Sequence, residues 1–230
     1  MKVFADGADV ETIIALAADP KISGFTTNPT LMRKSGVTDY ESFARKVLET
    51  IVSHPISFEV FADEPDEMLR QARVIASWGP NVFVKIPVTN TKGCSTESVV
   101  RELSAEGVHL NITALMTVAQ VEKVTVAAAG GPAHVISVFA GRVADTGRDP
   151  IPIMRQSLEV MASHPQLELI WASPREVLNI AQAEAIGVHI ITVTRDLLAK
   201  LAGFGKNLDL FSLETVQMFH NDAQAAGFSL

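Results

Sequence analysis

Cysteine is nearly absent from this chain, since Cys94 is the only one among its 230 residues. No intrachain disulfide can form, and this scarcity favours a reducing, cytoplasmic location. Clusters of basic charge are absent too. There are 19 basic and 26 acidic residues, which gives a formal net charge of −7, and no stretch interleaves basic with aromatic residues. We therefore expect neither nucleic acid nor an anionic membrane surface as a partner.

Long hydrophobic runs and metal-binding patterns are also lacking. No run approaches the roughly 18 apolar residues that cross a membrane, and the first residues lack the apolar core of a signal peptide. The six histidines show no paired metal-ligand spacing, and no His-Glu-x-x-His occurs. No Gly-x-Gly-x-x-Gly follows the first apolar run, which disfavours a dinucleotide-binding fold. We expect a protein that needs no metal or other cofactor.

What the chain does contain is a regular alternation of short apolar runs and longer segments of helical period. This order predicts the α/β class and a single (β/α)8 barrel (TIM barrel) over residues 1–230, a fold of typically about 250 residues. A doubly wound open sheet is the alternative. The eight strands are expected near residues 2–6, 22–26, 56–62, 81–87, 108–113, 134–140, 167–172 and 189–193.

Residues 212–228 form an additional helix-like segment after the last predicted strand. Leu213, Val216 and Phe219 are spaced to share one helical face. This extra C-terminal helix would bury its apolar face either against its own barrel or against a neighbouring subunit.

Several helix starts are marked in the sequence. Thr38 with Glu41 and Thr117 with Gln120 resemble capping boxes, and Asn28 precedes a proline as a helix N-cap would. Asp9 is placed to cap the first helix, which leaves Asp6 free for another role.

One lysine interrupts an apolar run, Asn81-Val-Phe-Val-Lys-Ile-Pro-Val88. Burial among apolar neighbours lowers a lysine's pKa and makes its free amine available as a nucleophile. The simpler interpretation is a lysine whose head reaches water at a strand end. A buried lysine amine is suited to attack a carbonyl and form a Schiff base. Lys85 is therefore the candidate nucleophile.

Polar side chains lie near the carboxyl ends of most predicted strands, where barrel enzymes place their chemistry. A lysine, two carboxylates, amides and two arginines around one opening would suit a phosphorylated carbonyl substrate. Singly, Asn28 is explained as a cap and the arginines as surface ion-pair partners. Thr192 and Thr194 are interpreted as structural. The candidates are Asp6, Thr26, Thr27, Asn28, Glu59, Lys85, Asn111, Thr113, Ser137, Phe139, Arg142, Ser173 and Arg175.

The same segments resemble, in order and over almost the whole chain, the successive motifs of the transaldolase family in its short-chain form. The combination of Thr-Thr-Asn-Pro with Val-Lys-Ile-Pro about sixty residues later is specific to that family. The matching segments are Phe4-Ala-Asp6, Gly24-Phe-Thr-Thr-Asn-Pro-Thr30, Val84-Lys-Ile-Pro87, Leu110-Asn-Ile-Thr113, Ser137-Val-Phe-Ala-Gly-Arg142 and Ala172-Ser-Pro-Arg175.

The resemblance implies a (β/α)8 barrel that carries out class I, Schiff-base aldol chemistry without a cofactor. Lys85 would attack C2 of a ketose phosphate. Asp6 would take the C4 hydroxyl proton, and Glu59 and Thr113 would hold the water that carries protons during formation and dehydration of the carbinolamine.

The resemblance also implies the substrate-binding residues. Asn28, Asn111 and Ser137 would bind hydroxyls of the three-carbon unit, with Thr26 and Phe139 beside them. Arg142, Ser173 and Arg175 would hold the phosphate. Short relatives commonly form decamers of two pentameric rings, so a homo-oligomer of sugar-phosphate-converting subunits is expected.

Two activities share the family, transfer of the three-carbon unit to an aldose phosphate and its release as dihydroxyacetone by fructose 6-phosphate aldolases. The aldolases usually carry Gln where this chain has Glu59, Tyr at Phe139, and often a smaller residue at Asn111. All three positions favour transfer. Pro174 departs from the aromatic residue that is common in transaldolases, and the chain is as short as the aldolases.

Further alternatives remain open. One is a specialised transaldolase that acts on a longer or sulfonated sugar. Another is a barrel isomerase or lyase that uses the same lysine on a different carbonyl. A barrel that only binds or assembles, with no turnover, is disfavoured because a non-enzyme has no physical reason to keep a buried amine beside two carboxylates.

Overall fold

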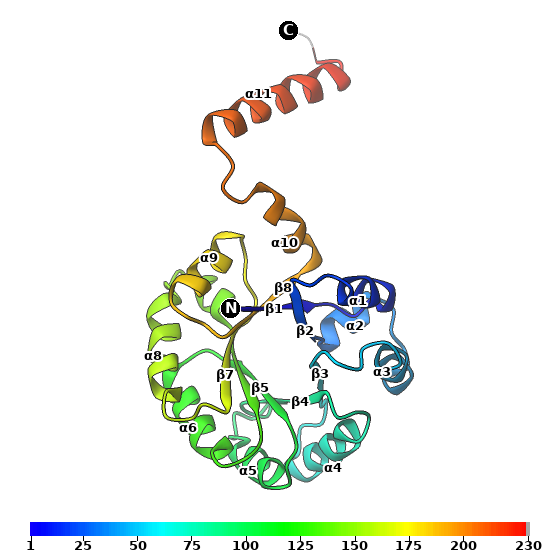
Figure 1. The fold of residues 1–230 in the computed structure, drawn as a ribbon, viewed down its shortest axis with the longest axis vertical. Helices are drawn as coiled ribbons and strands as arrows, with labels where there is room; N and C mark the ends of the chain where they lie inside the picture. The colour runs from blue at the N-terminus through cyan, green and yellow to red at the C-terminus, as the bar shows by residue number, and fades with distance from the viewer. Residues whose placement is uncertain (229–230) are drawn as a thin grey trace.

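Strand β1 (Lys2–Asp6) pairs with β2 (Ile22–Thr26) on one side and with β8 (Ile190–Thr194) on the other. Residues 1–228, which the computed structural model describes, thus form a closed barrel of parallel strands in the order β1 to β8 (Figure 1). The prediction of a (β/α)8 barrel is confirmed. The doubly wound alternative is excluded, because an open sheet has two edge strands and no strand of this sheet has a free edge.

The elements alternate along the chain as the sequence pattern indicates. The other strands are β3 (Ile56–Glu59), β4 (Val82–Pro87), β5 (Leu110–Leu115), β6 (His134–Val138) and β7 (Leu167–Trp171). The helices are α1 (Val10–Ala17), α2 (Pro29–Lys34), α3 (Tyr40–Leu48), α4 (Pro65–Ala76), α5 (Glu97–Ala105), α6 (Val118–Ala128), α7 (Ala140–Ala144), α8 (Ile151–Met161), α9 (Leu178–Ala185), α10 (Arg195–Lys200) and α11 (Leu208–Ala225).

The main core lies between the strands and the surrounding ring of helices. Its side chains come from both layers, for example Phe25 and Phe58 from strands and Met68 and Leu103 from helices. Parallel strands covered by helices are buried on both faces, which is why they appear in the sequence as nearly continuous apolar runs. In the described part of the chain, no helix is long and apolar enough to cross a membrane.

Most predicted helix starts are confirmed. The Asp9 side chain accepts a hydrogen bond from the Thr12 N–H (2.8 Å), and Asn28 accepts one from the Leu31 N–H (3.0 Å). Thr117 and Gln120 form a complete capping box at α6. The cap of α3 was predicted wrongly.

Asp39, not Thr38, is the N-cap of α3. Its carboxylate accepts from the Ser42 N–H (3.0 Å) and the Ser42 hydroxyl (2.8 Å). Two donors held by one carboxylate replace the reciprocal Thr38–Glu41 bonds that the sequence suggested, and Glu41 instead pairs with Arg45.

Strand β3 ends at Glu59, three residues before the predicted end at residue 62. Its register with β2 extends only to Ser57, because β2 ends at Thr26 and the chain turns into α2. A strand that loses one neighbour cannot continue its ladder on that side. Strand β6 likewise ends at Val138, since α7 begins at Ala140.

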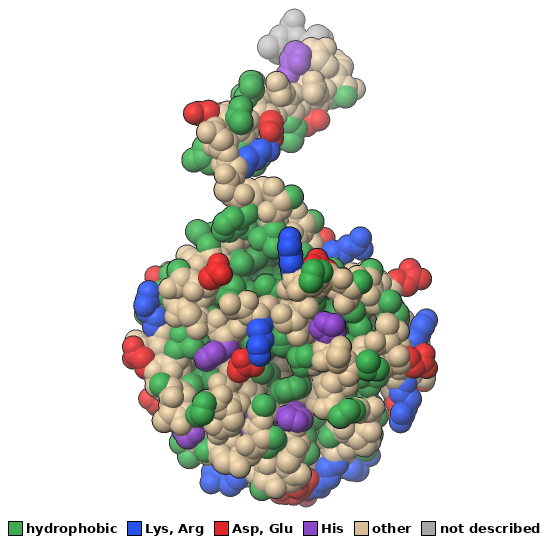
Figure 2. Space-filling view, in the orientation of Figure 1, with side chains coloured by type: hydrophobic (Ala, Val, Ile, Leu, Met, Phe, Trp, Pro, Cys, Tyr) green, Lys and Arg blue, Asp and Glu red, His purple; other side chains and the backbone are tan. Residues whose placement is uncertain are grey.

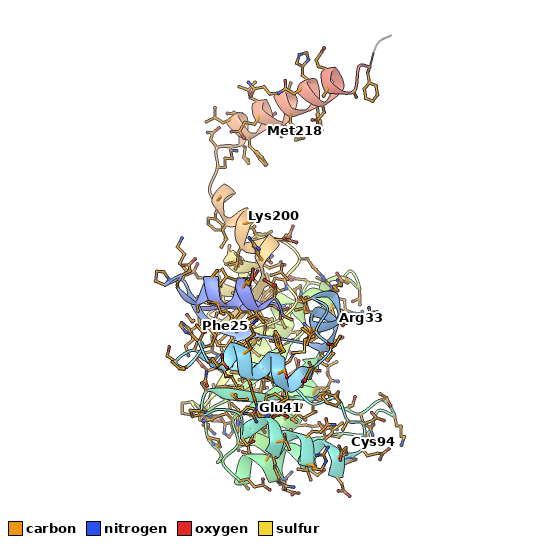
Figure 3. All side chains as sticks on the ribbon, turned by 90° about the vertical axis from the view of Figure 1, so that its right-hand side faces the viewer. Phe25, Arg33, Glu41, Cys94, Lys200 and Met218 are labelled. Atoms are coloured by element: carbon orange, nitrogen blue, oxygen red, sulfur yellow. The ribbon has the colours of Figure 1, made fainter. Side chains whose placement is uncertain are left out.

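The predicted C-terminal helix is present as α11, shifted toward the N-terminus because Asn207 caps it through the N–H groups of Asp209 and Leu210. Two perpendicular views show α11 standing away from the barrel (Figures 1 and 3), and several hydrophobic side chains are visible along it among polar and charged ones (Figure 2). None of its residues is buried. Its exposed apolar side chains are Leu208, Leu210, Phe211, Leu213, Val216, Met218 and Phe219.

One buried histidine links strand pairing to pH. His134, at the start of β6, accepts the Leu110 N–H at its Nδ1 (3.1 Å), and its Nε2 lies 2.9 Å from the Ser104 hydroxyl. Burial, and secondarily the charge of His109, lower the pKa of His134 to about 4. The acceptor role of Nδ1 requires the neutral ring.

We therefore expect the free energy of unfolding to decrease as the pH falls from 6.5 toward 4. The unfolded chain binds a proton at His134 in this window and the folded chain does not. The resulting decrease in the free energy of unfolding is about 3 kcal/mol at most. The contribution is complete above pH 6.5. Urea unfolding at several pH values should show a shallower dependence for His134→Asn, whose side-chain oxygen keeps an acceptor. Equal slopes for the two proteins would contradict the prediction.

Candidate active site

A cavity of about 430 Å³ opens at the carboxyl ends of the strands. Each of the strands sends at least one residue, or the residue that follows it, to this cavity, because alternate side chains of a barrel strand point inward. Its lining is Asp6, Thr26, Asn28, Pro29, Thr30, Leu31, Glu59, Lys85, Asn111, Thr113, Ala114, Ser137, Phe139, Arg142, Ala172, Ser173 and Thr192.

Lys85 lines the cavity and is only 6% exposed. Its Nζ is 2.9 Å from Glu59 Oε2 and donates to the Thr27 carbonyl oxygen, also at 2.9 Å. Strands β3 and β4 bring the pair together, because Glu59 and Lys85 stand opposite each other in the register. The buried lysine therefore has a carboxylate within proton-transfer distance.

Asp6 is held by a chain of two threonines. The Thr26 hydroxyl donates to Asp6 Oδ1 (2.8 Å), and its oxygen lies 2.5 Å from the Thr192 hydroxyl. Since Thr26 has one proton and gives it to Asp6, Thr192 must be the donor in the second bond. Burial raises the pKa of Asp6, while the Lys85 charge and the Thr26 hydrogen bond oppose this rise.

A second polar chain crosses the barrel. Asn111 donates through its Nδ2 to Ser57 Oγ (3.0 Å), and its Oδ1 accepts from Ser137 Oγ (2.7 Å). All three side chains are buried. Thr113 Oγ, next on the same face of β5, is buried without a hydrogen-bond partner among the described residues. A buried hydroxyl of this kind needs a water or substrate atom as its partner.

The far wall of the cavity is formed after β6 and β7. Arg142 lies over the Phe139 ring, with its guanidinium carbon 5.5 Å from the ring centre. Ser173 adopts a left-handed backbone conformation (φ 57°). A Cβ on Gly141 would lie 1.5 Å from the Ser173 carbonyl oxygen, so only glycine allows these two strand ends to meet.

The chain that carries this constellation of residues matches known proteins along nearly its whole length. The model of the transaldolase/fructose-6-phosphate aldolase family matches residues 3–230. The chain belongs to this family. Its members are enzymes that act through a lysine Schiff base.

Two relatives show how closely the chain follows the family. It is 36% identical over 202 residues to a "Probable transaldolase" from Dehalococcoides mccartyi, which covers 87% of this chain and 90% of that protein. It is 35% identical over 223 residues to "Probable transaldolase 2" from Listeria monocytogenes, which covers 92% of this chain and 98% of that one.

Solved structures of low sequence identity share the fold. A mandelate oxidase variant gives a TM-score of 0.57 at 16% identity, over 90% of this chain and 69% of that one. A candidate fructose-1,6-biphosphate aldolase from Coccidioides immitis gives 0.54 at 14% identity, over 89% and 80%.

The structure of this transaldolase-family chain brings all but two of the thirteen candidate residues to the cavity lining. The backbone carbonyl of Thr27, not its side chain, bonds to Lys85. The Thr27 hydroxyl donates to the Ser57 carbonyl. Arg175 is half exposed and bonds to Asp145, with 3.0 Å between its Nε and Oδ1 and a second bond between Nη2 and Oδ2. In this arrangement Arg175 lies outside the lining.

Three residues that hydrogen-bond to candidate site residues were not themselves among the thirteen candidates. Thr192, interpreted as structural, lines the cavity, and Ser57 completes the Asn111 chain. Tyr40, at the start of a helix, bonds to the backbone of Glu59. Thr192 had a detectable signal, because it lies two residues before the end of β8. The cavity residues Lys85 and Thr113 occupy the same position in β4 and β5. Ser57 and Tyr40 had none.

Replacing Thr26 by valine removes the hydrogen bond that stabilises the charged form of Asp6. We therefore expect a higher Asp6 pKa in Thr26→Val than in the original protein, with Thr26→Ser close to the original. Titration of the Asp6 carboxyl carbon by NMR measures this directly. A pKa that stays the same or falls in Thr26→Val would show that the Thr26 hydroxyl does not stabilise the carboxylate.

Proposed function

We propose that this protein is a transaldolase that moves a dihydroxyacetone unit from a ketose phosphate to an aldose phosphate. The observation that carries the proposal is the buried Lys85 amine, 2.9 Å from the Glu59 carboxylate and in one cavity with Asp6. A nucleophilic amine must first lose a proton, and Glu59 is positioned to receive it.

The reaction begins when the neutral Lys85 amine attacks C2 of a ketose phosphate such as fructose 6-phosphate or sedoheptulose 7-phosphate. The carbinolamine loses water and becomes a protonated imine. Glu59 and a water held by the unpartnered Thr113 hydroxyl exchange the protons of this dehydration.

Carbon–carbon cleavage then requires a base and an electron sink. Asp6 removes the C4 hydroxyl proton, the C3–C4 bond breaks, and the electron pair moves into the imine to give an enamine. The aldose phosphate leaves. In the reverse direction the enamine attacks the acceptor aldehyde, and Asp6 returns the proton to its oxygen. The elevated pKa of Asp6 suits a group that must both take and give a proton.

The remaining residues would bind the substrate. Asn28, Asn111 and Ser137, with Thr26 beside them, face the three-carbon unit. Arg142 and Ser173 lie at the far wall, where the phosphate of the substrate would be held by charge-assisted hydrogen bonds. Arg175 would join them by leaving Asp145, which requires the exposed ion pair to open; such pairs contribute little to stability.

Phe139 supports transfer over release. A tyrosine hydroxyl near the imine can help to protonate the enamine and release free dihydroxyacetone, whereas phenylalanine has no proton to give. The Phe139 ring also carries the Arg142 guanidinium on its face. The second candidate activity is that of a fructose 6-phosphate aldolase, the other activity in the family's description. A transaldolase specialised for a longer or sulfonated sugar is a variant of the first.

The test is intact-mass analysis after incubation with fructose 6-phosphate and borohydride. We expect a reduced three-carbon adduct that is lost in Lys85→Ala and kept in Lys92→Ala, which removes an exposed lysine. Without borohydride, sedoheptulose 7-phosphate should appear only when erythrose 4-phosphate is added. Acceptor-independent dihydroxyacetone would identify an aldolase instead, and no adduct from any ketose phosphate would overturn the proposed chemistry.

We also place the enzyme in the cytoplasm as a homo-oligomer, a pentamer or decamer. Support for the oligomer comes from α11, whose apolar side chains are uncovered in the single chain. Leu213, Val216 and Phe219 are each more than half exposed. A face of this composition is typical of a helix that packs on another subunit.

Light scattering should therefore give a mass several times that of the 24.7 kDa chain. The double substitution Val216→Glu with Phe219→Glu places two charges in the apolar face and should reduce the mass toward that of one chain. Glu substitution of Asn221, a polar residue of the same helix, is the matched control. A monomeric mass for the original protein would exclude the oligomer.

A further inference from the structure

Tyr40, the only tyrosine of the chain, forms hydrogen bonds with the backbone of Glu59, the residue whose carboxylate pairs with Lys85. Tyr40 is the first residue of α3, on the outside of the barrel. Its hydroxyl accepts a hydrogen bond from the Glu59 N–H (2.7 Å) and donates one to the Glu59 carbonyl oxygen (2.9 Å). One phenol thus satisfies both backbone groups of a single residue.

These bonds replace a missing strand. On the β4 side the ladder continues past Glu59, since the Val60 N–H donates to the Lys85 carbonyl (3.1 Å). On the β2 side the last bond runs from the Thr27 N–H to the Ser57 carbonyl (3.2 Å), after which β2 turns into α2. In a parallel sheet, successive residues of a strand direct their backbone N–H and C=O groups alternately to the strand on one side and to the strand on the other. The backbone groups of Glu59 therefore face the side where no strand remains, and the Tyr40 hydroxyl occupies it.

The phenol is itself held rigidly. The Tyr40 ring makes edge contacts with Phe58, Phe61 and Trp78, with centroids 6.2, 5.7 and 5.6 Å away. Burial raises the Tyr40 pKa well above its ordinary range, so the hydroxyl keeps its proton and can both donate and accept. An aromatic cluster outside the barrel thereby fixes the last residue of β3.

We infer that Tyr40 is a positioning residue that holds Glu59 at the correct distance from Lys85 for proton transfer. The inference rests on the proposed role of Glu59. A displacement of about 1 Å in a reacting group can cost on the order of a hundredfold in rate. A role confined to stability would instead lower the unfolding temperature and leave the lysine chemistry of the folded protein unchanged.

The test compares rates of borohydride-trapped adduct formation with fructose 6-phosphate in folded, full-length proteins. Tyr40→Phe keeps the ring and removes both hydrogen bonds, and it should form the adduct at least about tenfold more slowly. Thr38→Val, which removes an exposed hydroxyl two residues from Tyr40 that makes no bond to Glu59, should match the original protein.

The decisive comparison is made in a Glu59→Ala background. If Tyr40 acts through the Glu59 side chain, adding Tyr40→Phe to Glu59→Ala should slow trapping little further. An equally large additional loss, or an unchanged rate for Tyr40→Phe alone, would overturn the inference. Should Tyr40→Phe fail to fold, replacement of tyrosine by 3-fluorotyrosine alters only residue 40 in this chain and changes the strength of both bonds; an unchanged trapping rate there would also overturn it.

Hydrogen exchange of the Glu59 amide separates this inference from the proposed function. The amide should be protected in the original protein and exchange faster in Tyr40→Phe. If the original protein forms no adduct, the proposed function fails and the positioning role of Tyr40 with it, whatever the exchange result. If the adduct forms but the Glu59 amide exchanges equally in both proteins, only the role of Tyr40 fails.

Discussion

The pairing of a buried amine with a partly buried carboxylate is the constraint on which the rest of this site depends. Burying Lys85 alone would cost several kcal/mol, and the attraction of Glu59 offsets this cost only if the remaining hydrogen-bonding groups of the amine are satisfied. The Thr27 carbonyl supplies one partner for the lysine. Because the two charged residues stand on neighbouring strands in register, the barrel itself sets their distance.

Around this pair the polar residues form short chains that cross from strand to strand. Thr192, Thr26 and Asp6 connect β8, β2 and β1, whereas Ser137, Asn111 and Ser57 connect β6, β5 and β3. Satisfied buried networks of this kind restrict each side chain to one orientation. The site is therefore organised before a substrate arrives, which is the arrangement that electrostatic catalysis requires.

Much of this could be predicted from the sequence because barrel strands and their ends follow local rules. Eight apolar runs located the strands, and the inward-facing polar residues at their ends followed from the alternation of side chains. Lys85 was identified because a charge inside an apolar run is costly. The caps at Asn28 and Thr117 were predicted correctly because capping is local: each side chain bonds to the backbone three residues further along the chain.

What could not be predicted depends on contacts between distant segments. The early end of β3 follows from where β2 turns away, and Tyr40, on helix α3, bonds to the backbone of Glu59 nineteen residues later in the chain. Asp39 displaced Thr38 as the cap of α3 because its carboxylate holds two donors at once. The position of Arg175 was set by Asp145, thirty residues away, which no pattern near Arg175 reveals.

The contact between Gly141 and the Ser173 carbonyl has a consequence for how this site can change over evolutionary time. Any side chain at position 141 would push the β7 end away from the β6 end, so helix α7, which carries Arg142, and the loop that carries Ser173 must vary together or not at all. The part of the lining at Pro29, Thr30 and Leu31 contains no glycine in such a close contact. New substrate preferences in descendants of this chain are therefore most accessible through the rim at α2, while the wall after β6 and β7 stays fixed.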